Sequence, residues 1–268
     1  MEIAAYIASV FIGVSLGMIG GGGSILTVPV LVYMFGISPV VSTSYSLFIV
    51  GSTSLVGAYN NYRKGDVKIK TALLFGSTSI TTVFLTRKFL IPLIPKDIFK
   101  IAGFQVTEPI LTMILFAILM VAASVGMIKS KVRKPGCLEC DLKRNLIRML
   151  LSGIGIGLTT GILGAGGGFL LIPTLVLVLG MPMKEAVGTS LLIIALNSLI
   201  GFAGDIGHFV TDWIFLLKIT AIAMAGILIG GAAAKKVEAT YLKKGFGWFV
   251  LVMGIYIISK ELVGLSVF

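Results

Sequence analysis

Two glycine clusters decide the fold of this chain. Residues 17–24 read Gly-Met-Ile-Gly-Gly-Gly-Gly-Ser and residues 161–168 read Gly-Ile-Leu-Gly-Ala-Gly-Gly-Gly, and a proline, Pro29 or Pro173, follows each cluster after five residues. Consecutive glycines lose too much conformational entropy to sustain a helix, and a nearby proline removes a backbone donor. Each cluster therefore predicts a break between two helices.

The segments around the clusters are too apolar for a soluble protein. Hydrophobic residues make up 57% of the 268 residues and charged residues 12%, whereas soluble domains carry about 25% charged residues. A core of this length could not hide so much apolar surface from water, so lipid must solvate much of it. The composition predicts an all-α polytopic membrane protein and excludes soluble enzymes, disulfide scaffolds and disordered tails.

The two clusters belong to an internal repeat. Shifting the sequence by 144 positions aligns residues 12–57 with residues 156–201 without a gap, and the aligned pairs include seven glycine pairs and one proline pair. Shared apolar bias does not align glycines and prolines, so the match indicates duplication. We expect two homologous halves, residues 1–128 and residues 146–268, joined by a hydrophilic linker at residues 129–145.

Each half contains five apolar segments. They cover residues 3–19, 24–36, 41–59, 69–86 and 108–128 in the first half, and residues 146–163, 168–181, 186–204, 213–234 and 245–264 in the second. A membrane-spanning helix needs about 20 residues, and the second segment of each half is shorter. We expect the first two segments to form a broken hairpin that enters and leaves on one side, followed by three spanning helices. Two tilted full spans are the alternative.

The basic residues are confined to loops and predict the orientation. The net charge is +11, and the linker and residues 235–244 are rich in Lys and Arg, as cytoplasmic loops are. Residues 60–70 should then be cytoplasmic and residues 204–212 external, which makes the halves inverted repeats with external termini. One loop disagrees with this scheme, with Arg87, Lys88, Lys96 and Lys100: either the charge rule fails there or these residues form an external basic vestibule for anions. Loop charges of this kind predict no nucleic acid partner.

The glycine clusters are the candidate substrate site. Lipid cannot pair the backbone groups that a break frees, so the breaks should line a protein cavity. Backbone N–H groups at the start of the following half-helix can hold an anion there without a buried Lys or Arg. Close helix packing is the alternative for the glycines, and bonding within one helix is the alternative for nearby hydroxyls. The candidate substrate-binding residues are Gly20, Gly21, Gly22, Gly23, Ser24, Ser44, Ser46, Gly164, Ala165, Gly166, Gly167, Gly168, Thr189, Ser190 and Asn197.

Few other residues offer chemistry. Asp205, with Asn60 and Asn61, is either a gating group or a solvated loop residue, and Lys218 is either a proton carrier or a side chain that reaches outward to the interface. Cys137 and Cys140 form a single CxxC pair, which lacks the second pair of ligands that a zinc site needs. We therefore predict no metal and no cofactor.

The duplicated stretch resembles a known family. Residues 20–29, residues 164–173 and the sequences Gly-Thr-Ser at 188–190 and Ser-Leu-Ile-Gly at 198–201 are similar to the TauE/SafE sulfite-exporter family, also called the TSUP transporters. The resemblance covers nearly the whole chain. It implies a membrane permease for a sulfur-containing or organic anion such as sulfite, thiosulfate or a sulfonate, often coupled to a proton or to the membrane potential.

The expected function is therefore transport. We expect a multi-pass secondary transporter of the plasma or inner membrane that moves a small anion by alternating access, with lipid and the anion, with or without a coupled proton, as its partners. The alternative is a membrane-embedded enzyme or assembly factor. No His, Asp and Glu cluster lies within a span and no phosphate loop is present, which weighs against catalysis.

Overall fold

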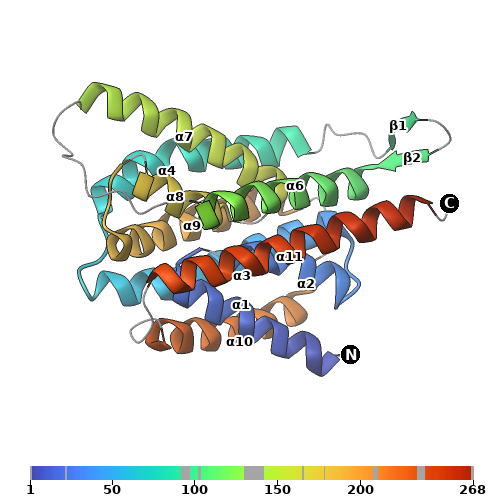
Figure 1. Ribbon diagram of the computed structural model, residues 1–268, viewed down its shortest axis with the longest axis horizontal. Helices are drawn as coiled ribbons and strands as arrows, with labels where there is room; N and C mark the ends of the chain where they lie inside the picture. Colours follow the sequence, from blue (N-terminus) through green and yellow to red (C-terminus); the bar gives the residue numbers. More distant parts are fainter. Residues whose placement is uncertain are drawn as a thin grey trace.

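A computed structural model describes residues 2–21, 23–91, 97–101, 104–129, 142–164, 166–177, 179–207, 211–233 and 239–266 (Figure 1). The elements of the first half are α1 (Glu2–Ile19), α2 (Ser24–Tyr33), α3 (Pro39–Tyr62), α4 (Ile69–Leu85), the π-helix η1 (Thr86–Leu90), β1 (Asp97–Ile101), β2 (Phe104–Thr107) and α6 (Glu108–Lys129). Those of the second half are α7 (Leu142–Leu163), α8 (Gly168–Leu177), α9 (Met183–Asp205), α10 (Trp213–Ala233) and α11 (Ala239–Ser266).

The described residues form an all-α membrane fold with one small exception. Each of the ten predicted apolar segments corresponds to an α-helix. Among the described residues, four helical stretches are long and apolar enough to cross a membrane, namely Pro39–Tyr62, Ile69–Leu90, Met183–Asp205 and Trp213–Ala233. The exception is β1 and β2, an antiparallel hairpin that the sequence pattern did not predict.

The second helix of each half is too short to cross. Both α2 and α8 contain 10 residues, which at about 1.5 Å per residue is about 15 Å, half of a hydrocarbon core of about 30 Å. Two full tilted spans are therefore excluded for these segments. Instead, α2 turns back along α1, because the backbone at Gly23 lies against the Ile12 carbonyl and Leu16 of α1.

The same glycine geometry ends α1 and α7. Gly20 has φ +76° and Gly164 has φ +65°, values in the left-handed region that suits glycine and commonly terminates a helix. The N–H of Gly20 still donates to the Leu16 carbonyl at 2.7 Å, and the N–H of Gly164 donates to the Thr160 carbonyl at 2.9 Å. Each helix thus ends at the predicted break.

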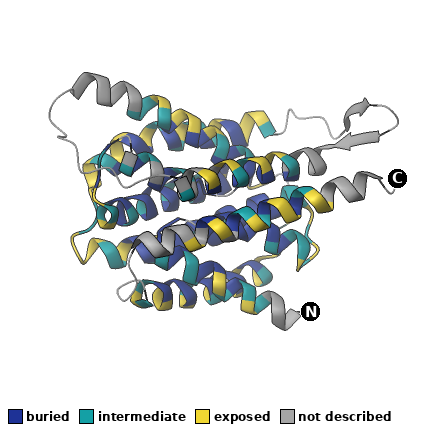
Figure 2. Ribbon diagram, viewed as in Figure 1, coloured by how far each residue is buried: buried dark blue, intermediate teal, exposed yellow. Residues whose placement is uncertain are grey.

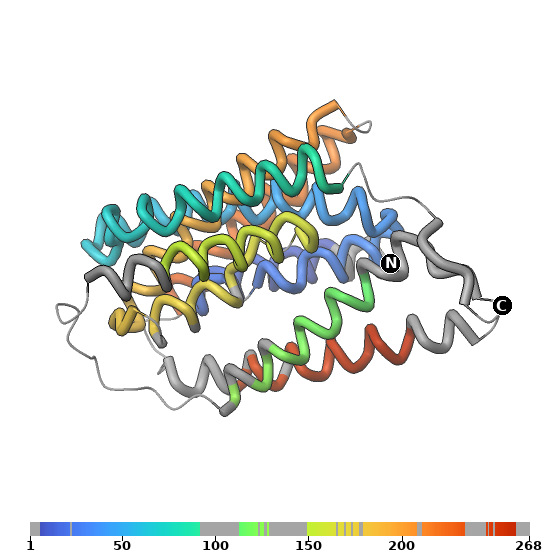
Figure 3. The backbone as a smooth tube through the Cα atoms, turned by 90° about the horizontal axis from the view of Figure 1, so that it is seen from above, coloured from blue at the N-terminus to red at the C-terminus, as the bar shows by residue number. Residues whose placement is uncertain are grey.

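Corresponding helices run in opposite directions. In Figure 1, α1 begins and α11 ends at the same end of the long axis; α3 runs away from that end, whereas its counterpart α9 runs towards it. Seen from above, the helices form one elongated bundle (Figure 3). Helices of one half pack on helices of the other: α1 on α10, α7 on α4 and α3 on α9.

Glycines allow these helices to pack closely. The glycine contacts of one half recur in the other half at positions 144 residues later. A Cβ at Gly13 would collide with Ala223, and a Cβ at Gly157 would lie 2.7 Å from the Ser79 carbonyl oxygen. Gly157 is 144 positions after Gly13, and Ala223 is 144 positions after Ser79. Equivalent residues therefore make equivalent contacts with the opposite half, as small residues at membrane helix interfaces allow.

The burial pattern is that of a protein in lipid. Large apolar side chains such as Phe11, Leu73 and Ile214 lie exposed on the outside of the bundle, and the exposed residues lie along the outer faces of the helices (Figure 2). Many hydroxyl side chains are buried inside, among them Ser46, Ser54 and Ser198. Exposed apolar surface on this scale would cause aggregation in water but is favourable in a bilayer.

Candidate functional site

The two glycine breaks touch each other inside the bundle. A Cβ at Gly21 would lie 2.6 Å from the carbonyl oxygen of Gly168, and a Cβ at Gly168 would lie 2.6 Å from the Cα of Gly21. Real Cβ atoms do not approach other atoms so closely, so no side chain larger than hydrogen fits at either position. The first break and the start of α8 therefore meet backbone to backbone.

Each break is also attached to a long helix of the opposite half. Gly20 lies against Val187 of α9, and its carbonyl accepts a 2.8 Å hydrogen bond from the Ser190 hydroxyl. Gly164 lies against the backbone of Thr43 of α3, the residue that the 144-residue offset pairs with Val187. Each break is therefore held in place by contacts with the opposite half.

Several buried hydroxyls lack a hydrogen-bond partner among the described residues: Ser46 and Ser54 of α3, Ser198 of α9, and Thr160 of α7, which lies against Gly167. Ser46, Val50 and Ser54 are spaced by four residues and share one face of α3. A Cβ at Gly166 would lie 2.9 Å from Val50 Cγ1 and 3.0 Å from Ser198 Oγ. The hydroxyl face of α3 and the Ser198 hydroxyl of α9 therefore both border the second break.

Free hydroxyls in such a place need a physical reason. A buried polar group without a partner costs about 1–3 kcal/mol, and nearly all buried polar groups in proteins are paired. A ligand that passes between the breaks would supply the missing partners. These hydroxyls are consequently the strongest candidate ligands in the described part of the chain.

Asn197 joins this region to α4. Its Nδ2 donates a 2.6 Å hydrogen bond to Ser79 Oγ, while its Oδ1 has no partner among the described residues. The hydrogen bond to Ser79 fixes the orientation of the Asn197 amide. Sequence spacing alone did not reveal Ser79 as its partner. The position that corresponds to Ser79 in the second half is Ala223, so this contact is made on one side only.

The remaining candidates divide into those near the breaks and those elsewhere. Ser24 caps the first break, because its hydroxyl donates to the Gly21 carbonyl at 2.7 Å, and Gly23 and Gly167 lie against α1 and α7 of their own halves. Ser44 is buried and unpaired among the described residues, but a separation of two residues places it on the side of α3 opposite Ser46. Gly22 and Ala165 lie outside the described residues.

Thr189 belongs to a different feature. Its hydroxyl accepts a 3.0 Å hydrogen bond from the backbone N–H of Lys68, and Lys68 Nζ also lies 3.2 Å from Glu185 Oε1. Thr189 therefore ties the loop after α3 to the start of α9. In the other half, Tyr45 Oη accepts a 2.8 Å bond from the backbone N–H of Asp212, and these two residues are offset from Thr189 and Lys68 by the same 144 positions.

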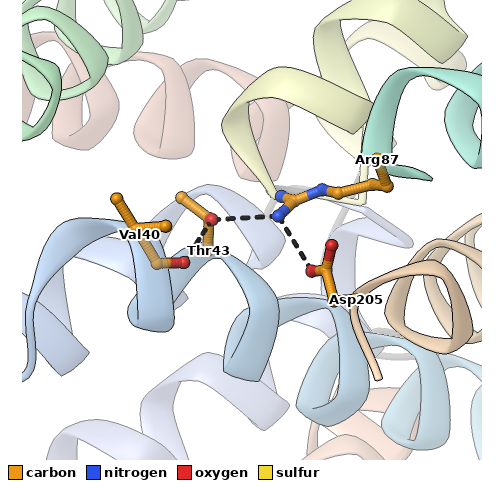
Figure 4. Close-up of polar contacts among 4 residues, drawn as sticks. All are labelled: Val40, Thr43, Arg87 and Asp205. Atoms are coloured by element: carbon orange, nitrogen blue, oxygen red, sulfur yellow. Dashed lines mark hydrogen bonds and ion pairs between the residues drawn. The ribbon is translucent and has the colours of Figure 1, made fainter. Parts of the chain in front are cut away.

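A buried ion pair lies beside the second break. Arg87 is 1% exposed and Asp205 is 5% exposed. Arg87 Nη1 donates to Asp205 Oδ2 at 3.0 Å and to Thr43 Oγ1 at 3.2 Å, as Figure 4 shows. The Thr43 hydroxyl in turn donates to the Val40 carbonyl at 2.8 Å. The prediction of Asp205 as a solvated loop residue is therefore wrong, and Arg87 is not a surface cation.

This pair could have been suspected from the sequence. Arg87 and Asp205 each stand directly after a long apolar segment, where a charge is costly unless it is paired. Their pairing across 118 positions was not visible, because no local pattern relates the end of α4 to the end of α9.

Other candidate residues lie away from the breaks or outside the described residues. Lys218 is exposed on α10, which fits a side chain that reaches outward. Cys137 and Cys140 are not among the described residues. Within the part of the chain that the structure describes, no three His, Cys, Asp or Glu side chains gather as metal ligands would.

The chain matches the family described as "Sulfite exporter TauE/SafE" over residues 5–257. It belongs to this family. A probable membrane transporter protein of Xylella fastidiosa (strain 9a5c) is 27% identical over 93% of this chain and 92% of its own length. The probable membrane transporter protein YdhB of Bacillus subtilis (strain 168) is 27% identical over 87% of this chain and 90% of its own. MJ0441 of Methanocaldococcus jannaschii, also named a probable membrane transporter protein, is 23% identical over 94% and 93%. No solved structure matches the chain.

Membership of the TauE/SafE family agrees with the fold. The family and the printed names of these relatives indicate a membrane transporter, and the four long apolar helices of the described part indicate a multi-pass protein in contact with lipid.

Proposed function

We propose that this TauE/SafE protein is a secondary transporter that moves a small sulfur-containing or organic anion, of the sulfite, thiosulfate or sulfonate class, across the plasma membrane. The observation that carries the proposal is the contact between Gly21 and Gly168, bordered by the free hydroxyls of Ser46, Ser54 and Ser198. The two breaks separate to admit the anion beside these hydroxyls, and the anion is released on the opposite side.

The chemistry of these groups suits an oxyanion. Hydroxyl groups donate hydrogen bonds to sulfur oxyanions, and the starts of α2 and α8 add the positive ends of two helix dipoles. Such neutral donors stabilise a negative charge without cancelling it, so the anion can leave again. The substrate class itself is taken from the family description, which the donors fit.

The reciprocal contacts favour alternating access between two inverted halves, residues 1–128 and 146–268. Each break is attached to the long helix of the other half, Gly20 to Val187 and Gly164 to Thr43. If one attachment opens while the other holds, the space between the breaks becomes accessible from one side only. Paired broken helices in inverted repeats have this role in other secondary transporters.

Two equivalent hydrogen bonds between a loop and a long helix, here called the loop ties, support one gate at each end of the bundle. The Lys68 N–H bonds to Thr189 at one end of the bundle, and the Asp212 N–H bonds to Tyr45 by the equivalent contact in the other half. Both bonds are formed in this structure, and in this proposal each must break for its gate to open.

The proposal is tested by flux into proteoliposomes. Uptake of labelled sulfite, thiosulfate, sulfate and methanesulfonate is measured for the wild type and for Ser46→Ala and Ser198→Ala. We expect saturable uptake of at least one sulfur anion and a KM raised about tenfold in the variants, since each loses one donor to an anion. Measuring at different pH gradients shows whether a proton accompanies the anion.

Ser77→Ala is the matched control, because this hydroxyl is exposed on α4 and bonds only to its own helix at the Leu74 carbonyl. It should transport like the wild type. Absence of flux for every sulfur anion, or an unchanged KM in both Ser46→Ala and Ser198→Ala, would overturn the proposal.

A further inference from the structure

The guanidinium of Arg87 has a free side. Its Nη1 makes both hydrogen bonds described above, whereas its Nε and Nη2 have no hydrogen-bond partner among the described residues. The side chain is 1% exposed, so neither lipid headgroups nor bulk water satisfies these donors. A buried cation with two idle donors is costly unless something binds there.

The idle donors have the geometry of an oxyanion site. Nε–H and one N–H of Nη2 point the same way from the planar guanidinium, and this pair forms the fork that binds carboxylates, sulfonates and similar oxyanions with two parallel hydrogen bonds. Asp205 occupies Nη1 and leaves this fork untouched. A second anion can therefore bind without displacing Asp205.

The Arg87 side chain lies next to the second break. Thr43 links the two: its Oγ1 accepts from Arg87 Nη1, and its backbone lies against Gly164. The residue before Arg87, Thr86, lies against Gly161 of α7, so η1 packs where α7 ends. An anion bound to Arg87 is thus one residue, Thr43, away from the second break.

The site exists in only one half. The 144-residue offset relates Arg87 to Gly231, Asp205 to Asn61 and Thr43 to Val187, and none of the three counterparts carries a charge. The loop ties and the Gly13 and Gly157 contacts repeat between the halves, whereas this ion pair does not. The pathway is therefore chemically different at its two ends.

We propose that Arg87 forms a second oxyanion site, which receives the transported anion at one end of the pathway before or after it occupies the space between the breaks. Asp205 is a positioning residue: it holds the guanidinium through Nη1 and cancels its charge, so the anion binds weakly enough to move on. This inference rests on the transport function proposed above, and it adds a site with a cationic donor at one end only.

Anion binding to the purified protein in detergent tests the proposal. Dissociation constants for thiosulfate and methanesulfonate are measured by calorimetry and thermal shift for the wild type, Arg87→Gln, Arg87→Lys, Asp205→Asn and the double variant Arg87→Gln/Asp205→Asn. Asp205→Asn leaves the guanidinium charge uncompensated and should tighten binding about tenfold, while slowing turnover in vesicles.

Arg87→Lys keeps the charge but loses the fork, so it should weaken binding about tenfold, and Arg87→Gln should weaken it further. The double variant is the decisive one. If the pair only stabilises the fold, removing both charges restores the wild-type Kd and KM. If Arg87 binds the anion, the double variant stays as weak as Arg87→Gln.

Lys88→Gln is the control for net charge, because Lys88 is exposed beside Phe84 and Phe89 and its loss changes the charge equally; it should keep the wild-type Kd. A double variant with wild-type Kd and KM, or Asp205→Asn binding more weakly than the wild type, would overturn the second site. Wild-type protein without anion flux would instead overturn the transport proposal, so the two failures are distinguishable.

Discussion

The hydroxyl of Ser190 on α9 donates to the carbonyl of Gly20 at the end of α1, at 2.8 Å, and shares its proton with the Val187 carbonyl of its own helix, at 2.9 Å. This carbonyl is one of the backbone groups that the break frees, and it finds its partner 170 residues away in the opposite half. The bond therefore both satisfies the break and couples the halves.

Loss of this bond should destabilise the protein. Ser190→Ala leaves a buried carbonyl without a donor, which costs about 1–3 kcal/mol, so we expect the Tm in detergent to fall by several degrees. Ser190→Thr keeps the hydroxyl and should retain most of the stability. An unchanged Tm in Ser190→Ala, measured beside the exposed-site control Ser77→Ala, would contradict this role for the bond.

A side chain in the second break should abolish transport. Gly166 has φ +64°, and a Cβ there meets Val50 and Ser198, so Gly166→Leu displaces the groups that border the second break. Gly155→Leu is the control, since Gly155 is exposed on α7 with no atom near its Cβ position. We expect no uptake in the first variant and normal uptake in the second.

Folding of the Gly166 variant is checked by its elution volume and helical circular dichroism. Should it fail to fold, Gly166→Ala replaces it, for which a reduced uptake is expected. Wild-type flux in either variant would show that the break is not part of the path.

The two loop ties should act as opposing gates. Tyr45→Phe removes the acceptor of the Asp212 N–H, and Thr189→Val removes the acceptor of the Lys68 N–H. One hydrogen bond is worth about 1 kcal/mol, or about fivefold in an equilibrium constant. We expect each variant to favour opening at its own end of the bundle.

A cysteine at Ser54 reports on these gates through its reaction with an impermeant thiol reagent added to one side of sealed vesicles. In a background without Cys137 and Cys140, the labelling rate should rise from one side in Tyr45→Phe and from the other side in Thr189→Val. Equal changes from the same side in both variants would refute the paired gates.

Orientation can be tested with the loops themselves. Lys64 is exposed in the loop after α3, and Ile206, 61% exposed, follows α9. The basic loops predict that Lys64 is cytoplasmic and Ile206 external. In the same cysteine-free background, Lys64→Cys and Ile206→Cys should be labelled from opposite sides of right-side-out vesicles, and labelling from the same side would remove the inverted arrangement.

Local sequence properties were sufficient for the architecture. Hydropathy located the ten helices because lipid demands apolar side chains and internally paired backbones. Glycine clusters located the ends of α1 and α7, because only glycine adopts the positive φ found at Gly20 and Gly164 without strain. The hairpin of β1 and β2 was not predicted, since it lies in a loop without apolar periodicity.

The site was only partly accessible from sequence. The glycine motifs predicted the breaks as the candidate site, and in the structure Gly21 and Gly168 are in contact there. Sequence position did not separate Ser46, which shares a face of α3 with Val50, from Ser44, which lies on the opposite side of α3, because both are hydroxyls in the same apolar helix.

What the sequence alone determined is therefore the membrane fold, the two breaks and the repeat, all of which are encoded in neighbouring residues or in a constant offset. Only the tertiary structure decided that Ser190 satisfies Gly20 and that Arg87 is buried against Asp205. Hydrogen bonds and ion pairs between helices depend on which faces meet after packing, and that choice is made by the whole bundle, not by any one segment.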